Sequence, residues 1–148
     1  MVAAYLIALA LGMTAVPFPI LSAIDKACGD DLECKADVLT YAQAESGMNE
    51  APRAFSHDAK AHVSCGILQI PCRFVAEHRD LDSQVAYWVK LRFWSLHACQ
   101  ALPRNEAMAA LASGNCDHGR ELSRSRYETA SAALWGLSVG LTVDTARR

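Results

Sequence analysis

The sequence predicts a single, mainly α-helical domain stapled by disulfides, and three observations lead to this fold class. The chain has 148 residues, a length that suits one domain rather than two. Apolar residues recur at helical spacing in several long segments and leave little room for a sheet. Six cysteines, an even number, follow an uncharged N-terminal stretch, which is typical of disulfide bonding in an oxidising compartment.

The overall composition narrows the class of protein further. Hydrophobic residues make up 52% of the chain and charged residues 20%, which is typical of a globular protein. The formal net charge of −2 argues against a non-specific nucleic-acid-binding protein, which usually has a basic face. We therefore expect no nucleic-acid partner.

Residues 1–24 carry no charged side chain, and about 20 such residues can span a bilayer. Pro17 and Pro19 interrupt the run, and the small residues Ser22 and Ala23 follow. We expect a signal peptide or N-terminal membrane anchor over 1–24, with the folded domain over 25–148. The protein would then be exported, and be periplasmic, extracellular or membrane-anchored. The absence of Lys and Arg from the stretch argues against a signal peptide, and the alternative is an N-terminal helix buried in the domain.

The pairing of the cysteines cannot be read from the sequence alone. Short spacings favour Cys28–Cys34 and Cys65–Cys72, which leaves Cys99–Cys116. A zinc site is the alternative, because His57, His62, Cys65 and Cys72 have side chains that bind zinc. No CxxC pair is present and the spacing is irregular, so we expect disulfides and no metal.

The first strongly helical segment is Asp30 to Ser46. Leu32, Ala36 and Leu39 recur at helical spacing, and Asp30 or Asp31 can cap the start. Gly47 suits the C′ position that ends a helix, so Glu45 is expected in the last turn. A polar loop with a short hairpin should follow over Met48 to Ser64, and then a compact apolar turn from Gly66 to Pro71.

Three later segments also have helical patterns. Ser83 to Cys99 is apolar nearly all round, which predicts a helix buried in the middle of the domain, with Trp88 and Trp94 in the core. Asn105 to Leu111 predicts a short helix. Ser123 to Leu137 begins the final helix, whose apolar continuation is too short to span a membrane.

Two short segments resemble a known family. Glu45-Ser46-Gly47-Met48-Asn49 resembles the ESxxN segment of lytic transglycosylases in the lysozyme-like superfamily, and Gly66-Ile67-Leu68-Gln69 resembles their GLMQ segment. The order ES followed by GILQI is similar to c-type lysozymes too. Ala109 to Asn115 looks like a degraded AYNAG segment, and the stretch from Ser125 resembles the closing helix. The resemblance covers roughly residues 30–134.

This resemblance implies a lysozyme-like domain that cleaves the β-1,4 bond between N-acetylmuramic acid and N-acetylglucosamine in peptidoglycan. It implies no cofactor and a monomer. Glu45 is the candidate acid/base, because cleavage requires a proton on a poor leaving oxygen. A helix C-terminus and apolar neighbours such as Met48 and Ile67 favour the protonated carboxyl that this step needs.

The second carboxylate of a two-carboxylate hydrolase is missing from its usual place. A c-type lysozyme has an aspartate two residues before the glycine of GILQI, and Ser64 stands there in this chain. Asp58 is the substitute in the second half of the loop, whereas Glu50 is too near the helix end to assign. A transglycosylase needs one glutamate, so the sequence favours a transglycosylase over a muramidase hydrolase of the same fold.

Supporting roles follow from the same resemblance. Ser46, Gln69 and Tyr127 are candidate substrate-binding residues, with Tyr127 as the source of the hydroxyl that the degraded AYNAG segment lacks. Gln69 could equally satisfy the backbone of its own turn. Asn49 and Gly66 are candidate structural residues of the two motifs. Because the AYNAG segment is eroded, an inactive domain that binds glycan or a protein partner remains the alternative to an enzyme.

Overall fold

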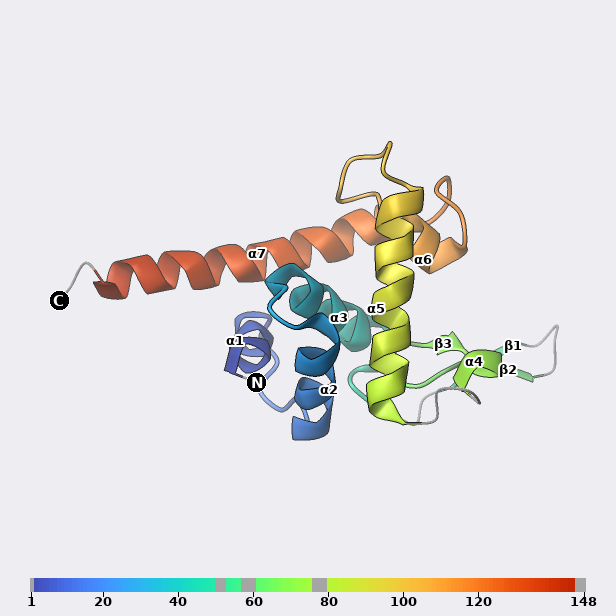
Figure 1. The fold of residues 1–148 in the computed structure, drawn as a ribbon, viewed down its shortest axis with the longest axis horizontal. Helices are drawn as coiled ribbons and strands as arrows, with labels where there is room; N and C mark the ends of the chain where they lie inside the picture. The colour runs from blue at the N-terminus through green and yellow to red at the C-terminus, as the bar shows by residue number, and fades with distance from the viewer. Residues whose placement is uncertain (1, 50–52, 57–60, 76–79, 146–148) are drawn as a thin grey trace.

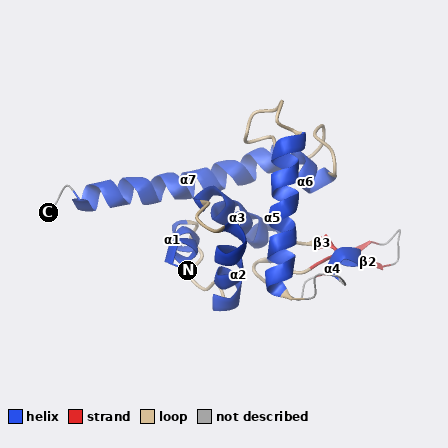
Figure 2. Ribbon diagram, viewed as in Figure 1, coloured by secondary structure: helices blue, strands red, loops and turns tan. Residues whose placement is uncertain are grey.

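A computed structural model of the chain describes residues 2–49, 53–56, 61–75 and 80–145. The described residues are mainly helical, as the sequence predicts (Figure 2). Helices α1 (Val2–Ala10), α2 (Phe18–Cys28) and α3 (Leu32–Ser46) form a cluster beside α5 (Leu81–Ala98) (Figure 1). The long helix α7 (Arg120–Thr145) runs across this cluster, and its C-terminal end projects from the body (Figure 1).

Helix α3 has the boundaries that the sequence predicts. The Asp31 carboxylate accepts a hydrogen bond from the backbone N–H of Cys34 at 2.9 Å, which caps the first turn. Gly47 ends the helix in the left-handed conformation, with φ of 60°. Residues 34–42 are all buried, so α3 is the central helix of the domain. Glu45 therefore stands on the last turn of a rigid element.

The N-terminal stretch of the chain packs into the core. Ala4, Ile7 and Ala8 of α1 are buried, as are Ile20 and Ile24 of α2. Residue 24, the expected end of the leader, lies inside α2. Within the described residues, no helix is both long and apolar enough to cross a bilayer.

Helix α5 differs from the prediction on its outer face. Trp88 is buried at 1% exposure, as expected, but Trp94 is 48% exposed and Phe93 is 72% exposed. The expectation that Trp94 belongs to the core is wrong. One side of α5 packs on α2 and α3, and α6 (Ala109–Ser113) covers only its C-terminal end, so one apolar face stays at the surface.

The two last helices begin and end elsewhere than expected. Residues 105–108 of the segment expected as a helix over 105–111 form tight turns, and α6 (Ala109–Ser113) starts four residues later than expected. Backbone bonds from Glu106 and Ala109 to carbonyls three residues earlier close these turns. Helix α7 begins at Arg120 instead of Ser123, directly after Gly119, whose φ is 76°. It extends to Thr145, well beyond the expected segment.

A small sheet lies on the far side of α5. Strands β1 (Arg53–Ser56), β2 (Ala61–Cys65) and β3 (Ile70–Pro71) pair antiparallel in that order, and α4 (Cys72–Val75) follows. Ser64 pairs with Pro71 and Cys65 with Ile70, so the segment from Gly66 to Gln69 is a tight connection. This sheet confirms the expected short hairpin and holds the segment beside the end of α3.

All six cysteines form the disulfides that their spacing favours. The bonds are Cys28–Cys34, Cys65–Cys72 and Cys99–Cys116. Cys28–Cys34 joins α2 to α3, and Cys65–Cys72 brackets the connection between β2 and β3. Because Cys65 and Cys72 are bonded to each other, they cannot be zinc ligands.

Two buried ion pairs connect the helices. Arg92 of α5 donates to Asp37 of α3 at 2.7 Å, and both side chains are 7% exposed. Burial raises the pKa of Asp37, although the Arg92 cation opposes the effect. Lys35 lies 2.5 Å from Asp25, which joins α3 to α2. The first pair therefore connects α5 to the central helix α3, and the second connects α2 to it.

Candidate active site

A pocket of about 230 Å³ lies where α3, α5, α6, α7 and the small sheet meet. Its wall includes Glu45 from the end of α3, Gln69 from the turn before β3, and Arg126 from α7. The other lining residues are mostly apolar: Tyr41, Ser64, Leu68, Ile70, Pro71, Trp88, Leu91, Leu111 and Ala112. The pocket therefore brings together both motifs that the sequence singles out.

Glu45 is the only carboxylate among the described lining residues. Its side chain is 31% exposed and it accepts a hydrogen bond from Arg126 Nη1 at 2.5 Å. The Arg126 side chain is only 11% exposed. Glu45 thus faces a partly enclosed pocket and not open solvent, with one cation held against it.

Tyr41 and Trp88 form the floor beneath this ion pair. The Arg126 guanidinium carbon lies 4.4 Å from the centre of the Tyr41 ring, a cation–π distance. The Tyr41 and Trp88 rings are 5.1 Å apart and tilted by 59°. Burial raises the pKa of Tyr41, while the Ser123 hydroxyl and the Arg126 charge act in the opposite direction. The phenol therefore stays neutral, and the floor is rigid and aromatic.

Ser46 connects the end of α3 to the turn that follows β2. Its hydroxyl lies 2.9 Å from the carbonyl oxygen of Ala42 and 2.7 Å from that of Ile67. Both atoms belong to the backbone, so Ser46 holds the Ile67 segment against the helix that bears Glu45. The structure gives this residue a bracing position, and it does not line the pocket.

Gln69 lies on the pocket wall and also satisfies its own turn. The Gln69 side-chain amide donates to the carbonyl of Gly66 at 2.8 Å, and the Gln69 φ is 47°. The φ of Gly66 is 76°, and a Cβ there would lie 2.3 Å from the Gln84 side-chain oxygen. The left-handed conformation therefore favours glycine at position 66, whereas the end of the flexible Gln84 side chain could move aside for a larger residue.

Ser64, two residues before Gly66, lines the pocket. A serine hydroxyl there can donate or accept a hydrogen bond but cannot act as a second carboxylate. Asp58 and Glu50, the two other carboxylates weighed from the sequence, lie outside the described residues.

Two sequence-predicted residues lie away from the pocket wall. Tyr127 is partly buried and interacts electrostatically with Arg104. It is next to Arg126 on α7, but the arginine and not the tyrosine reaches the pocket. Asn49 is exposed, and its backbone N–H donates to the carbonyl of Ser46 at 3.2 Å, which fits the turn role predicted for it.

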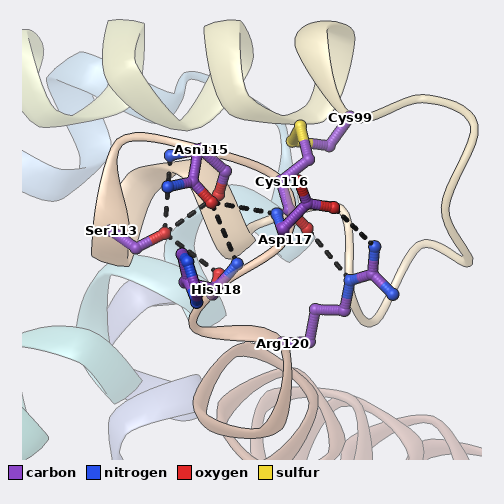
Figure 3. A network of polar contacts seen from close by, with 7 residues as sticks. All are labelled: Cys99, Ser113, Asn115, Cys116, Asp117, His118 and Arg120. Atoms are coloured by element: carbon purple, nitrogen blue, oxygen red, sulfur yellow. Dashed lines mark hydrogen bonds and ion pairs between the residues drawn. A yellow bond between two sulfur atoms is a disulfide. The ribbon is translucent and has the colours of Figure 1, made fainter.

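The segment from Ala109 to Asn115 divides into a pocket wall and a structural loop. Leu111 and Ala112 line the pocket. At the end of α6, Ser113 Oγ lies 2.9 Å from the carbonyl oxygen of Ala109. It also lies within 3.0 Å of the carbonyl oxygens of Asn115 and His118, and the Asn115 side chain accepts from two later backbone N–H groups (Figure 3). Arg120 donates to the carbonyl of Cys116 at 3.0 Å. These contacts and the Cys99–Cys116 bond fix the start of α7.

Arg126 is the site residue that the sequence analysis did not single out. Ser123 and Ala130, which are buried, lie three residues before it and four after it on α7. This spacing puts Arg126 on the buried face of the helix, where an arginine requires an anionic or aromatic partner. Helical periodicity could therefore have identified it, whereas the identity of its partner depends on the tertiary fold.

No family model, curated protein or solved structure matches the chain. Within the residues that the structure describes, no three His, Cys, Asp or Glu side chains are grouped as metal ligands. The chemistry of the pocket itself is therefore the basis for a functional proposal.

Proposed function

We propose that this protein is a lysozyme-like lytic transglycosylase that cleaves peptidoglycan at the bond between N-acetylmuramic acid and N-acetylglucosamine. One observation carries the proposal: Glu45, at the end of its helix, and Gln69, in the GILQ turn, line the same pocket. They are 24 positions apart in the sequence. The two motifs that resemble the family thus converge on one carboxyl group.

The positions around Glu45 support the same correspondence. Ser64 stands where c-type lysozymes have their aspartate, and Leu111 and Ala112 stand where the AYNAG segment falls; all three line the pocket. Ser46 joins the ES motif to the GILQ turn through the carbonyl of Ile67. The three disulfides fit a protein that works outside the cytoplasm.

The proposed reaction needs one carboxyl group and no cofactor. Protonated Glu45 gives its proton to the glycosidic oxygen, the bond from C1 to that oxygen breaks, and the leaving oxygen keeps the electron pair. The Glu45 carboxylate then takes the proton of the 6-hydroxyl of the same muramic acid while that oxygen bonds to C1. The product has a 1,6-anhydro end, and Glu45 is protonated again. Tyr41, Trp88 and Leu68 line the same wall and reduce the access of water.

Mass spectrometry of the products tests this proposal. Purified protein digests peptidoglycan sacculi, and we expect soluble fragments with 1,6-anhydromuramic acid ends. Reducing ends in their place would assign the protein to the hydrolases of the same fold, with water attacking C1. Intact sacculi, under conditions where a known muramidase digests them, would contradict both enzymatic assignments.

A non-enzymatic glycan-binding domain is the second candidate, and the pocket contains an observation in its favour. Glu45 is ion-paired with Arg126, and Leu111 and Ala112 lack the polar groups of the segment that they replace. Co-sedimentation with sacculi distinguishes this candidate: it predicts binding without release of soluble fragments, for the wild type and Glu45→Gln alike.

A further inference from the structure

The pocket contains a charged pair that conflicts with its proposed chemistry. Glu45 and Arg126 are the only charged groups among its described lining residues, and their side chains are 2.5 Å apart. A neighbouring guanidinium stabilises a carboxylate, yet the first chemical step needs a carboxylic acid. Tyr41 is the other titratable group on the wall, and it is neutral. A proton donor therefore forms at Glu45 only if Arg126 acquires a different partner.

The structure makes Arg126 a fixed binding group. Its side chain is 11% exposed and rests on the Tyr41 ring, whereas the Glu45 side chain is 31% exposed at the end of a helix. The Arg126 Nε–H is buried and has no hydrogen-bond partner among the described groups. A guanidinium has five N–H donors arranged to bind a carboxylate through two of them. Arg126 thus does not use all of its donors in the pair with Glu45.

We propose that Arg126 binds a carboxylate of the glycan substrate and releases Glu45 when it does so. The exchange leaves the Glu45 carboxyl without its guanidinium partner in the pocket, where it can contact the glycosidic oxygen. Two carboxylates on peptidoglycan have this chemistry: the lactyl group of muramic acid in strands without peptides, and the acidic groups of the peptide stem. The pair acts as a substrate-operated latch, and this inference rests on the proposed cleavage at Glu45.

The latch proposal is tested by measuring the preference of the enzyme among three glycan substrates. Wild type, Arg126→Gln and Arg126→Lys are compared on intact peptidoglycan, on strands stripped of peptides, and on N-acetylglucosamine oligomers, which have no carboxylate. The wild type should have a higher kcat/KM on a carboxylate-bearing glycan than on N-acetylglucosamine oligomers. Arg126→Gln should reduce this ratio about 10- to 100-fold, which is the usual contribution of a hydrogen bond to a charged group. Arg126→Lys, which keeps the charge without the fork, should fall between them.

The substrates also separate the two carboxylate sources. A preference for stripped strands identifies the lactyl group, and a preference confined to intact peptidoglycan identifies the peptide stem. Arg124→Gln is the matched control, because Arg124 lies on the same helix and pairs with Glu106 outside the pocket. It should keep the wild-type preference. Equal losses on all three glycans in Arg126→Gln would overturn the proposal and leave Arg126 a structural role.

A binding measurement keeps the latch separate from the cleavage reaction. Calorimetry compares N-acetylmuramic acid with N-acetylglucosamine on the wild type and on Glu45→Gln. Because Glu45→Gln leaves Arg126 without its carboxylate, it should bind the acid at least about 10-fold more tightly than the wild type does. If the protein cleaves glycan but Glu45→Gln does not bind the acid more tightly, the latch proposal is wrong and the cleavage proposal stands. If the tighter binding is observed but the wild type does not cleave glycan, the cleavage proposal is wrong and the exchange at Arg126 stands.

Discussion

Glu45, Arg126, Tyr41 and Trp88 form a continuous stack from the pocket mouth to the core. The ion pair at 2.5 Å rests on the Tyr41 ring, which rests in turn on Trp88, buried at 1% exposure. The functional carboxyl is therefore supported by side chains from three helices. Such support limits the positions that Glu45 can adopt, which is what a proton donor to a fixed bond requires.

The buried pair of Asp25 and Lys35 predicts acid sensitivity. Burial is the largest single effect and opposes ionisation, but the hydrogen bonds and charges of the neighbouring cations, Lys35 foremost, together outweigh it and hold the pKa of Asp25 below its usual 3.8. The stabilisation from this pair is therefore complete above the usual value and is lost as the pH falls through the lower folded-state value. Asp25→Asn should cost about 3–5 kcal/mol near neutral pH, because Lys35 remains buried without its partner.

Urea unfolding at a series of pH values checks this prediction. The deficit of Asp25→Asn should shrink as the solution is acidified below pH 3.8. Asp82→Asn is the control, because Asp82 pairs with Lys26 at the surface, where a pair contributes about 0–1 kcal/mol. An Asp25→Asn deficit that does not change with pH would show that the ion pair is not its cause.

At the scale of elements, the turn between β2 and β3 depends on the Cys65–Cys72 bond. This bond brackets the segment that carries Gln69, whereas Cys99–Cys116 fixes the loop before α7. Removing either by paired serine substitution should cost about 2–4 kcal/mol, with roughly 1 kcal/mol more for the longer Cys99–Cys116 loop. Activity should fall further in Cys65→Ser/Cys72→Ser, because its pocket wall is displaced.

Thermal unfolding and the rate of glycan release, measured on both double variants, check this difference. The Cys99→Ser/Cys116→Ser variant supplies the control for a general loss of stability. If the less stable of the two double variants is also the less active one, the loss of activity follows from the loss of stability. The turn between β2 and β3 then has no separate role in the site.

Local signals were sufficient to predict some elements and not others. The cap at Asp31, the stop at Gly47 and the cysteine spacings are local, so α3 and the disulfides follow from the sequence. The exposure of Trp94 depends on which faces of α5 the neighbouring helices cover, and no local pattern records that. Helical spacing on α7 could have identified Arg126 as buried, but its partners Glu45 and Tyr41 lie on a helix distant in sequence and could not be predicted locally.

At the scale of the whole molecule, the N-terminal helices contribute to the core that supports the site. Ile7, Ile20, Leu21 and Ile24 are each at most 6% exposed. Burial of each such side chain contributes about 1.5–3 kcal/mol, and a domain is stable by only about 5–15 kcal/mol. A chain of residues 25–148 should therefore lose cooperative unfolding.

Thermal unfolding followed by circular dichroism, on the full chain and on residues 25–148, makes this comparison. If residues 1–24 are a signal peptide, the opposite result is expected, because removal of a signal peptide leaves the mature domain intact. A shortened chain that unfolds cooperatively near the temperature of the full chain would show that α1 and the first part of α2 are dispensable.

The role of Glu45 as acid/base is tested most directly by the rate at which sacculi release soluble glycan, in the wild type and in Glu45→Gln. Glutamine keeps the shape of the side chain but cannot exchange the proton. A general acid contributes about 100- to 10,000-fold, so the rate should fall by at least about 100-fold at a temperature where the variant is folded. A Glu45→Gln protein that releases glycan as fast as the wild type would show that this carboxyl group does no chemistry.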